Sequence, residues 1–435
     1  MKKLIALLAS LFVGVCAHVN AVAAPVQSGV ARLDITPPLE MKASLGGYGE
    51  RMNKPATGVH DRVWAKALVL SEGERRFALV TADILGFPPG FKNAVAARLA
   101  AEGWRPEQIM LLPSHSHTSI DMSALNPANT FQIPQIGLYH KELYDRTVAK
   151  VAELIHAATQ NPVAITVGSV AVPLDGWNRN RRAGNKSVDP DLTLTRIDTE
   201  SGKPLAVLVN WTAHPTFMSE QDMMFSGDWP GHLQRTLEAL ISEGVTVMYY
   251  NGAEGDQSPV PRKDSGSAWE RAERYGRELG IIAWRDWGRI KPQRSPALDY
   301  HTVSITLPKR TWHPDFMATG GKEYGLNELN VAQLVERLFP TETHSMSLRL
   351  GDLVIVGVPG ELASGLGLKV KSAVREKLGV KHVAIGGLSD EWVSYILSPE
   401  EYSKGGGYEA SMSFYGATLG PTIVKGVIQS AAELK

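Results

Sequence analysis

Residues 108–119 combine an apolar run with a polar turn: Gln108-Ile109-Met110-Leu111-Leu112-Pro113 is followed directly by Ser114-His115-Ser116-His117-Thr118-Ser119. A run of four to eight apolar residues that ends in turn-forming residues is typical of a buried β-strand. The same succession recurs along the chain, and a stretch with helical spacing usually follows it. This alternation predicts an α/β fold in which mixed β-sheets are flanked by helices.

The strands expected from this pattern are short and rich in β-branched residues. They cover residues 77–81, 108–112, 163–172, 205–211, 245–250, 301–307, 346–350, 353–358 and 382–385. Helices are expected over residues 91–102, 140–159, 229–243, 268–287, 326–338, 362–378 and 422–434. The strands at 346–350 and 353–358 leave no room for a helix between them. This argues against a TIM barrel, in which a helix follows each strand.

Three further expected strands end in polar groups, as the first one does. The turns are Thr212-Ala213-His214-Pro215, Asn251-Gly252-Ala253-Glu254-Gly255-Asp256-Gln257-Ser258-Pro259 and Pro359-Gly360-Glu361. In open α/β sheets, ligands bind at the carboxyl ends of the strands, so these turns are candidates for one shared site. Two histidines and a carboxylate form the ligand set of a catalytic zinc site that leaves one position open for water.

Each of these residues also has a structural interpretation. His214 alone is more often a buried structural histidine than a ligand, and Glu361 alone could be an acid favoured at a helix N-terminus. The pair His115 and His117 allows two arrangements, because the strand ends there. Both imidazoles can bind one metal, or one can bind it while the other transfers protons.

Composition excludes several classes of protein. The 435 residues include 45 Lys+Arg and 45 Asp+Glu, so the formal charge is zero and a nucleic-acid partner is disfavoured. The hydrophobic content of 43%, with 41 Gly and 26 Pro, is that of a folded, loop-rich protein rather than a fibrous or disordered one. The chain is long enough to bury a sizeable core.

The first residues resemble an export signal. Lys2 and Lys3 precede an apolar run that ends near Cys16, and Ala21-Val22-Ala23 is a small-residue cleavage site. We therefore expect residues 1–23 to be a signal peptide, with the mature protein periplasmic or extracellular. Val15 before Cys16 disfavours a lipoprotein. Cys16 is the only cysteine, so cleavage leaves no disulfide.

A set of short motifs resembles the neutral/alkaline, non-lysosomal ceramidases, and the motifs follow that family's order. They are Asp34-Ile35-Thr36-Pro37, Gly47-Tyr48-Gly49, Gly58-Val59-His60-Asp61, Ala65-Lys66-Ala67, the turn at 114–119, Asn178-Arg179, Asn210-Trp211 with His214, Ser226-Gly227-Asp228, Gly255-Asp256-Gln257-Ser258-Pro259, Pro359-Gly360-Glu361, and Tyr395 with Glu400-Glu401-Tyr402. Each motif alone is weak, but the ordered set is specific.

The resemblance implies a zinc amidase that cleaves ceramide or a related N-acyl lipid into a fatty acid and an amine. It implies one ceramidase-like catalytic domain over residues 24–435, without the family's C-terminal immunoglobulin-like domain. The zinc ligands it implies are His115, His214, Glu361 and Tyr395. Tyr395 is an uncommon type of ligand, and its alternative is a buried aromatic residue with a hydrogen-bonded hydroxyl.

The resemblance also places three residues around the reacting amide: His117, Arg179 and Ser258. His117 is the candidate general acid and base. Arg179 either holds the substrate oxygen or belongs to a solvated basic run. We expect an activated water to be the nucleophile and Ser258 to position the substrate. Asp256 is expected to orient a neighbour or a zinc ligand.

Some features depart from the family. The turn at 114–119 lacks the glycine-rich continuation, and Val260 stands where the family prefers asparagine. The alternatives are a zinc amidohydrolase that acts on another small amide and a non-catalytic secreted binding protein on a hydrolase scaffold. No run of about 20 apolar residues predicts a membrane span, although peripheral membrane contact and the oligomeric state stay open. Residues 311–323 form either a loop over the site or an ordinary surface connection.

Overall fold

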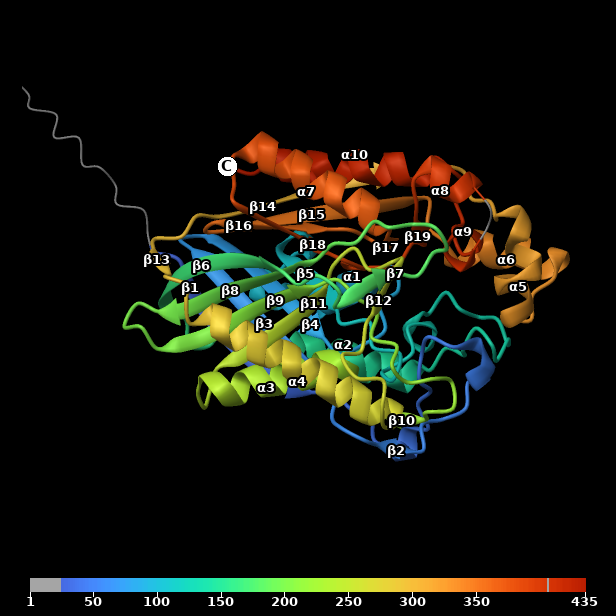
Figure 1. Ribbon diagram of the computed structural model, residues 1–435, viewed down its shortest axis with the longest axis horizontal. Coiled ribbons are helices and arrows are strands. Elements are labelled where there is room, and N and C mark those ends of the chain that lie inside the picture. The colour runs from blue at the N-terminus through green and yellow to red at the C-terminus, as the bar shows by residue number, and fades with distance from the viewer. Residues whose placement is uncertain (1–24, 405–406) are drawn as a thin grey trace, which may run out of the picture.

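The computed structural model describes residues 25–404 and 407–435. The predicted signal peptide therefore lies outside the described residues. The described chain forms four layers, with two β-sheets packed face to face and helices on both outer sides (Figure 1). This confirms the predicted α/β class of mixed sheets flanked by helices.

The larger sheet contains both antiparallel and parallel neighbours, in the order β11-β9-β8-β6-β1-β3-β4-β5. Only β4/β5 and β9/β11 pair in parallel along this path. The short β13 pairs with β6. The strands are β1 (Gln27–Asp34), β3 (Trp64–Glu72), β4 (Arg75–Ala82), β5 (Ile109–Pro113), β6 (Val163–Pro173), β8 (Asp191–Thr199), β9 (Pro204–Trp211), β11 (Thr246–Asn251) and β13 (Gln293–Arg294).

The smaller sheet has the order β14 (Leu298–Thr306), β15 (Glu342–Leu350), β16 (Leu353–Gly357) and β18 (His382–Gly386). Its first three strands are antiparallel, whereas β16 and β18 are parallel. Short strand pairs connect the loops at the ends of both sheets. They are β2 (Gly58–Val59) with β10 (Met224–Phe225), β7 (Asn178–Asn180) with β12 (Gln257–Pro259), and β17 (Glu361–Leu362) with β19 (Tyr395–Ile396).

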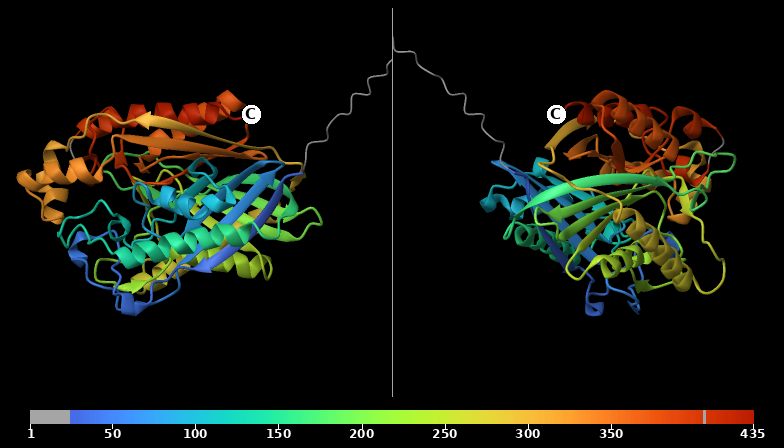
Figure 2. Two further views of the ribbon diagram at one scale, coloured as in Figure 1. Left: turned by 180° about the vertical axis from the view of Figure 1, so that it is seen from behind. Right: turned by 60° about the vertical axis from the view of Figure 1, so that its left-hand side comes forward.

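Three helix pairs cover the outer faces of the sheets. The pairs are α1 (Phe91–Arg98) with α2 (Lys141–Ala158), α3 (Asp228–Ile241) with α4 (Ala268–Trp287), and α7 (Ser364–Leu378) with α10 (Leu419–Ala432). The first pair packs on β3, β4 and β5, the second on β8, β9 and β11, and the third on the smaller sheet. Figure 2 shows α2 lying across the N-terminal strands in its left view.

The remaining helices are short and lie near the end where the strands terminate (Figure 1). They are α5 (Gly320–Glu323), α6 (Glu328–Leu338), α8 (Pro399–Ser403) and α9 (Tyr408–Ser411). Single 3₁₀ turns occur at Leu39–Met41, Gly49–Arg51, Ala100–Glu102, Pro106–Gln108, Ser123–Leu125 and Pro314–Ala318.

The interface between the two sheets forms the centre of the molecule. Leu68 and Leu79 of the larger sheet share one buried cluster with Met346 and Ile355 of the smaller sheet. Most neighbouring strands are antiparallel, so the TIM-barrel alternative is wrong. The expected strands at 346–350 and 353–358 form the antiparallel pair β15/β16.

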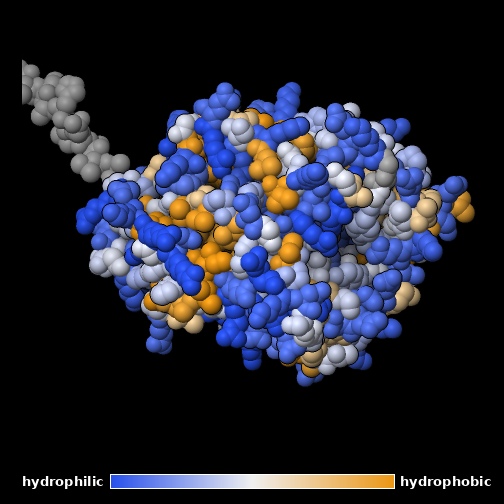
Figure 3. Space-filling model, in the orientation of Figure 1, coloured by the Kyte–Doolittle hydropathy of each residue, from blue (hydrophilic) through white to orange (hydrophobic). Residues whose placement is uncertain are grey.

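The surface in Figure 3 is mainly hydrophilic, and its apolar residues form separate groups. Exposed apolar residues are common on the surfaces of folded proteins. Among the helices of residues 25–404 and 407–435, none is both long enough and apolar enough to cross a membrane.

Candidate metal centre

Four strands from both sheets end beside one another, and each is followed by a turn that carries a polar side chain. His115 follows β5, His214 follows β9, Glu254 follows β11 and Glu361 follows β16. The parallel pairs β9/β11 and β16/β18 bring carboxyl ends to the same edge. The structure brings these turns together, and His115, His214 and Glu361 lie in mutual contact.

The two histidines that approach Glu361 are oriented alike. Nδ1 of His115 lies 2.6 Å from the carbonyl oxygen of Leu85, and Nδ1 of His214 lies 2.8 Å from that of Glu254. A carbonyl oxygen accepts a hydrogen bond, so each Nδ1 carries a hydrogen, and in the neutral ring Nε2 then keeps its lone pair. The Nε2 atoms lie 3.6 Å and 3.1 Å from Oε2 of Glu361.

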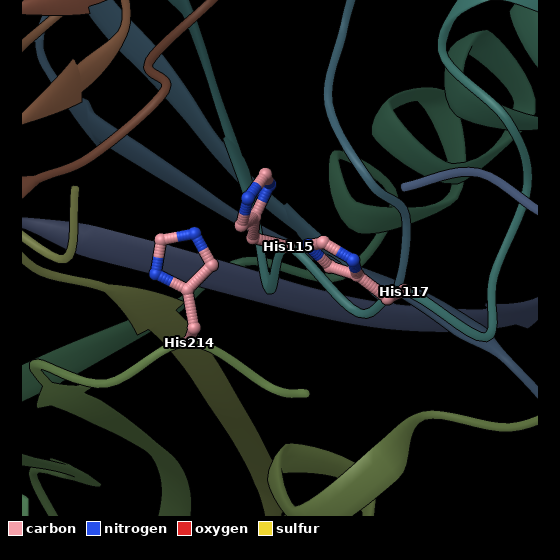
Figure 4. Close-up of side chains that lie close together, drawn as sticks. All are labelled: His115, His117 and His214. Atoms are coloured by element: carbon pink, nitrogen blue, oxygen red, sulfur yellow. The ribbon is translucent and has the colours of Figure 1, made fainter. Parts of the chain in front are cut away.

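The turn after β5 holds His115 in an unusual backbone conformation. His115 has a φ of 66°, in the left-handed region that disfavours most side chains. Its N–H donates to the carbonyl oxygen of Ile84 at 3.0 Å, which fixes this conformation. Figure 4 shows the three imidazoles of His115, His117 and His214 gathered in one place from two segments. Backbone strain of this kind is commonly found at functional sites.

Glu361 is a buried carboxylate that is held from two sides. Trp392 donates its indole N–H to Oε1 at 2.8 Å, while Oε2 faces the histidines. Burial opposes ionisation, but the imidazoles of His115 and His214 hold the pKa of Glu361 well below its usual range. Burial also lowers the pKa of His214, to about 3. The carboxylate and the neutral imidazole are the forms that bind metal.

Tyr395 lies next to Glu361 because β17 and β19 pair in parallel with these two residues in register. The Tyr395 hydroxyl accepts a hydrogen bond from Nη2 of Arg181 at 3.1 Å. Arg181 also donates to Glu409 at 2.6 Å, so the guanidinium is fixed between the two. Burial raises the pKa of the Tyr395 hydroxyl well above its ordinary value. The nearby guanidinium acts in the opposite direction.

His117 lies on the other side of His115, with ring centroids 5.1 Å apart. Both of its ring nitrogens are buried and have no hydrogen-bond partner among the described residues. Burial lowers its pKa well below the ordinary value. A Cβ on Gly47 would lie 2.2 Å from Nδ1 of His117, so only glycine leaves room for this ring.

Glu254 is a buried acid in the turn after β11, and the sequence predicted no role for it. Neither of its carboxylate oxygens has a hydrogen-bond partner in the described part of the chain. Donor atoms of His115, Glu254 and Glu361 lie within 4.8 Å of one another. The same holds for His115, His117 and His214. The structure therefore offers two overlapping groups of metal-binding side chains.

Three other predicted residues lie on the β7/β12 strand pair or next to it. Asp256 accepts hydrogen bonds from the Ser364 N–H at 2.9 Å and from the Asn180 amide at 2.7 Å, so it ties this turn to the start of α7. Ser258 pairs with Arg179, whose side chain is exposed. The structure does not place Arg179 or Ser258 among the described residues that line the cavity below. Their roles stay predictions.

A cavity of about 1230 Å³, including the open solvent at its mouth, lies over the cluster. His115, His117, Glu361 and Tyr395 contribute to its lining. The apolar part of the wall includes Leu85, Met122, Ile136, Phe316, Leu326, Leu334, Leu338, Phe339, Trp392, Met412 and Phe414. Phe316 belongs to the segment at 311–323, so this segment contributes to the site, but it forms the 3₁₀ turn Pro314–Ala318 and the short helix α5 rather than an irregular loop.

The contributions of Arg181, Trp392 and Glu254 were missed from the sequence. Arg181 could be read only as part of a basic run with Arg179 and Arg182, and its contact with Tyr395 spans 214 residues. Trp392 lies 31 residues from the carboxylate it contacts. One signal for Glu254 was available in the sequence. It lies in the turn after a predicted strand, as His115, His214 and Glu361 do.

The sequence model of the family described as neutral/alkaline non-lysosomal ceramidase, N-terminal, matches residues 27–260 and 327–423. The chain belongs to this family. His115, His214, Glu361 and Tyr395 all fall within the matched ranges, as do His117 and Glu254. The resemblance stated from the motifs is therefore confirmed.

Two curated ceramidases are similar to most of the chain. The neutral ceramidase of Pseudomonas aeruginosa is 22% identical over 90% of this chain and 69% of its own length. The neutral ceramidase of Mycobacterium tuberculosis is 21% identical over 85% of this chain and 71% of its own length.

Two solved structures share the fold of this ceramidase-family chain. A structure titled as ceramidase complexed with C2 has a TM-score of 0.80 and 20% identity, and covers 94% of this chain and 75% of its own. The crystal structure of neutral ceramidase from Pseudomonas aeruginosa has a TM-score of 0.79 and 21% identity, covering 94% and 74%.

The residues of the cluster fit a divalent cation. Two imidazoles present unprotonated Nε2 atoms beside a carboxylate, and further unpartnered donor atoms belong to His117 and Glu254. Buried polar atoms normally have partners, so several unpartnered acceptors in one place indicate a missing positive charge. The ceramidase-family chain thus contains a cluster of side chains that could hold a metal ion, at the base of a largely apolar cavity.

Proposed function

We propose that this protein is a zinc-dependent amidase that hydrolyses the amide bond of ceramide, or of a related N-acyl lipid, to a fatty acid and an amine. The observation that carries the proposal is the placement of two Nε2 atoms and Glu361 at the base of an apolar cavity. Family membership and the two relatives named neutral ceramidases support the choice of substrate.

His115, His214, Glu361 and Tyr395 would hold the cation. Imidazole nitrogen and carboxylate oxygen together are typical of catalytic zinc sites. When bound, zinc supplies Lewis acidity and makes water a better nucleophile at neutral pH. Leu85 and Glu254 orient the two histidines through their carbonyl groups, and Trp392 orients Glu361. Partners of this kind commonly tune the affinity of a metal site.

His117 would manage the proton in hydrolysis. Its ring nitrogens are buried, unpartnered and next to the ligand cluster, and burial keeps the imidazole neutral. A neutral imidazole accepts the proton that the attacking water releases, and then donates it to the leaving amine. The Tyr48 ring, whose centroid lies 4.9 Å away, and Gly47 keep the imidazole in place.

The apolar wall would bind the hydrocarbon part of the substrate. Each buried CH₂ group contributes about 0.8 kcal/mol, so several methylenes in this cavity provide substantial binding energy. The amide would then lie at the polar base, which His117, Glu361 and Tyr395 help to line. The cavity also separates the reacting amide from bulk water, which strengthens charge interactions at its base.

Export and domain organisation complete the proposal. We propose that residues 1–23 direct the protein out of the cytoplasm and that residues 24–435 act as one catalytic domain. The shared cluster between the two sheets supports treating the described residues as one unit. N-terminal sequencing of the exported protein tests the cleavage site, and an N-terminus other than Ala24 would contradict it.

Activity is tested with purified protein, zinc and a panel of ceramides and short N-acyl amides. We expect mass spectrometry to detect equal amounts of fatty acid and amine, and a chelator to abolish turnover until zinc is restored. His115→Ala and Glu361→Ala should lose more than the roughly 10–100-fold typical of residues that only support a ligand. His156→Ala, an exposed histidine on α2, is the matched control and should keep full activity.

The outcomes separate the alternatives. Full turnover by metal-free protein, or by His115→Ala, contradicts the zinc mechanism. Hydrolysis of short amides without hydrolysis of N-acyl lipids supports an amidohydrolase of other specificity. Binding of ceramide with no product at any metal concentration supports a non-catalytic binding protein.

A further inference from the structure

Glu254 has the least satisfied carboxylate near the ligand cluster. The residue is 0% exposed, and neither Oε1 nor Oε2 has a hydrogen-bond partner in residues 25–404 and 407–435. Glu361, by comparison, accepts an indole hydrogen bond and faces two imidazoles. An ionised carboxylate buried without any partner is much less stable than a paired one.

The carboxylate of Glu254 lacks a hydrogen-bond partner among the described residues, but other metal-binding atoms lie close to it. Its carboxylate lies within 4.8 Å of donor atoms of His115 and Glu361. Glu361 is itself negative, so a second ionised carboxylate close to it is unfavourable unless positive charge lies between them; without such a charge, Glu254 would have to keep its proton. A cation bound by His115 and Glu361 would supply that charge.

The backbone of Glu254 is fixed on several sides. Its carbonyl oxygen lies 2.8 Å from Nδ1 of His214 and also accepts the N–H of Gln257 at 2.8 Å. The next residue, Gly255, donates its N–H to the carbonyl of Leu362 at 3.0 Å. A Cβ on Gly387 would lie 2.5 Å from Oε2 of Glu254, so glycine there leaves space for the carboxylate. One residue therefore orients His214 and directs an acid toward the cluster.

We propose that Glu254 is a further protein ligand of the single cation bound by His115, His214 and Glu361. This inference rests on the metal centre of the proposed function and adds a ligand to the set expected from the family resemblance. Two carboxylates balance the two positive charges of zinc without ionisation of Tyr395. We therefore expect removal of the Glu254 charge to weaken zinc binding more than removal of the Tyr395 hydroxyl.

The first test measures zinc affinity by competition with a chromophoric chelator, and zinc content by elemental analysis. The variants are Glu254→Gln, which keeps the side-chain shape, and Tyr395→Phe. We expect one zinc per chain in the wild type, and an affinity loss of roughly 100-fold or more in Glu254→Gln, above the range for residues that only support a ligand. Glu391→Gln is the control, because Glu391 is also buried but accepts a hydrogen bond from Thr343 at 2.6 Å.

Cobalt substitution gives a readout that does not depend on activity. Visible absorption bands of Co²⁺ respond to the number and type of ligands, so Glu254→Gln should change them and Glu391→Gln should not. Wild-type zinc affinity together with an unchanged cobalt spectrum in Glu254→Gln would overturn the inference. A second zinc per chain that disappears in this variant would also overturn it, since Glu254 would then serve a separate cation.

A crystal structure of the zinc-loaded wild type decides the question even if the variants do not fold. We expect a Glu254 oxygen at the roughly 2.0–2.2 Å typical of zinc–carboxylate bonds. A Glu254 carboxylate outside this range, beside a zinc bound by His115 and His214, overturns the inference and leaves the proposed function intact. Wild-type protein that binds no zinc overturns both.

Discussion

Hydrogen bonds to the backbone determine how the histidines of this site are oriented. His115 and His214 are equivalent in sequence terms to any buried histidine, yet each donates Nδ1–H to a backbone carbonyl and keeps Nε2 free. The carbonyl partners lie 30 and 40 residues away, so no local pattern could indicate them. The sequence therefore predicted that His115, His214 and Glu361 meet, but not which ring atom each histidine would present.

Gly47 provides a test of His117 that leaves His117 itself unchanged. Gly47→Ala places a methyl group where the imidazole lies and also strains a backbone with a φ of 92°. We expect kcat to fall about 100-fold or more, within the range for lost acid–base catalysis, while zinc affinity stays near the wild-type value. Steady-state kinetics and zinc titration measure the two effects separately.

Gly90→Ala is the matched control for this substitution. Gly90 has a similar φ of 83°, but its added Cβ meets nothing within 4 Å. It should cost stability through backbone strain and leave kcat nearly unchanged. Equal losses of kcat in the two variants would show that strain, rather than displacement of His117, causes the effect.

The elements predicted best have a regular spacing of apolar residues and a helix cap. The helix expected at 268–287 is α4, Ala268–Trp287, whose N-terminus is capped by the Ser267 side chain and by Glu270. The strands β1, β3 and β8 were missed. In β3 the buried Lys66 interrupts an apolar run, and its partners, Glu238 and the Val247 carbonyl, come from α3 and β11. Such tertiary partners are invisible in a local pattern.

Asp390 joins elements that are distant in the chain. Its carboxylate accepts hydrogen bonds from Lys92 of α1 at 2.9 Å and from the Leu111 N–H of β5 at 2.8 Å, and lies 3.1 Å from Nε2 of His344 of β15. Asp390→Asn leaves the buried ammonium of Lys92 without its counterion. We expect a loss of about 3–5 kcal/mol in the free energy of unfolding, measured by urea denaturation.

This loss should depend on pH in a definite direction. Burial opposes ionisation of Asp390, but the Lys92 charge and the His344 hydrogen bond lower its pKa to about 2 from 3.8. The stabilisation is therefore fully present above pH 4 and disappears as the pH falls through about 2. The difference between wild type and Asp390→Asn should shrink over that window. Asp145→Asn, in an exposed pair with Lys141, should leave the free energy of unfolding nearly unchanged at every pH.

At the scale of the whole molecule, the cation would link separate parts of the fold. His115 and His214 extend from the larger sheet, whereas Glu361 follows a strand of the smaller sheet. The proposed metal thus bridges the two halves of the sandwich. A ligand that binds only the folded state stabilises that state by about 2.7 kcal/mol when the free ligand concentration is 100 times its dissociation constant.

Removal of metal is therefore expected to lower the melting temperature by several degrees, and zinc should restore it. Differential scanning calorimetry in the presence and absence of chelator measures the change. His115→Ala should show no response to either reagent. An identical response in wild type and His115→Ala would place the stabilising cation elsewhere in the protein.

The cavity leads to a prediction about substrate length. Leu334 of α6 is buried and lines the apolar wall, so Leu334→Trp fills part of the volume available to a hydrocarbon chain. We expect kcat/KM for long-chain ceramides to fall about 10-fold or more, corresponding to roughly two buried CH₂ groups, with little change for short chains. Equal losses for all chain lengths would show that the acyl group binds elsewhere.

The wall of the cavity combines residues inside the ranges matched by the family model with residues outside them. Phe316, Tyr324 and Leu326 lie in the stretch at 261–326 that separates the two ranges matched by the family model, whereas the proposed ligands lie inside those ranges. Selectivity can therefore diverge without disturbing the chemical machinery. Exchanging this stretch between homologues is a natural route to chimaeric enzymes that accept new lipids while inheriting an intact reaction centre.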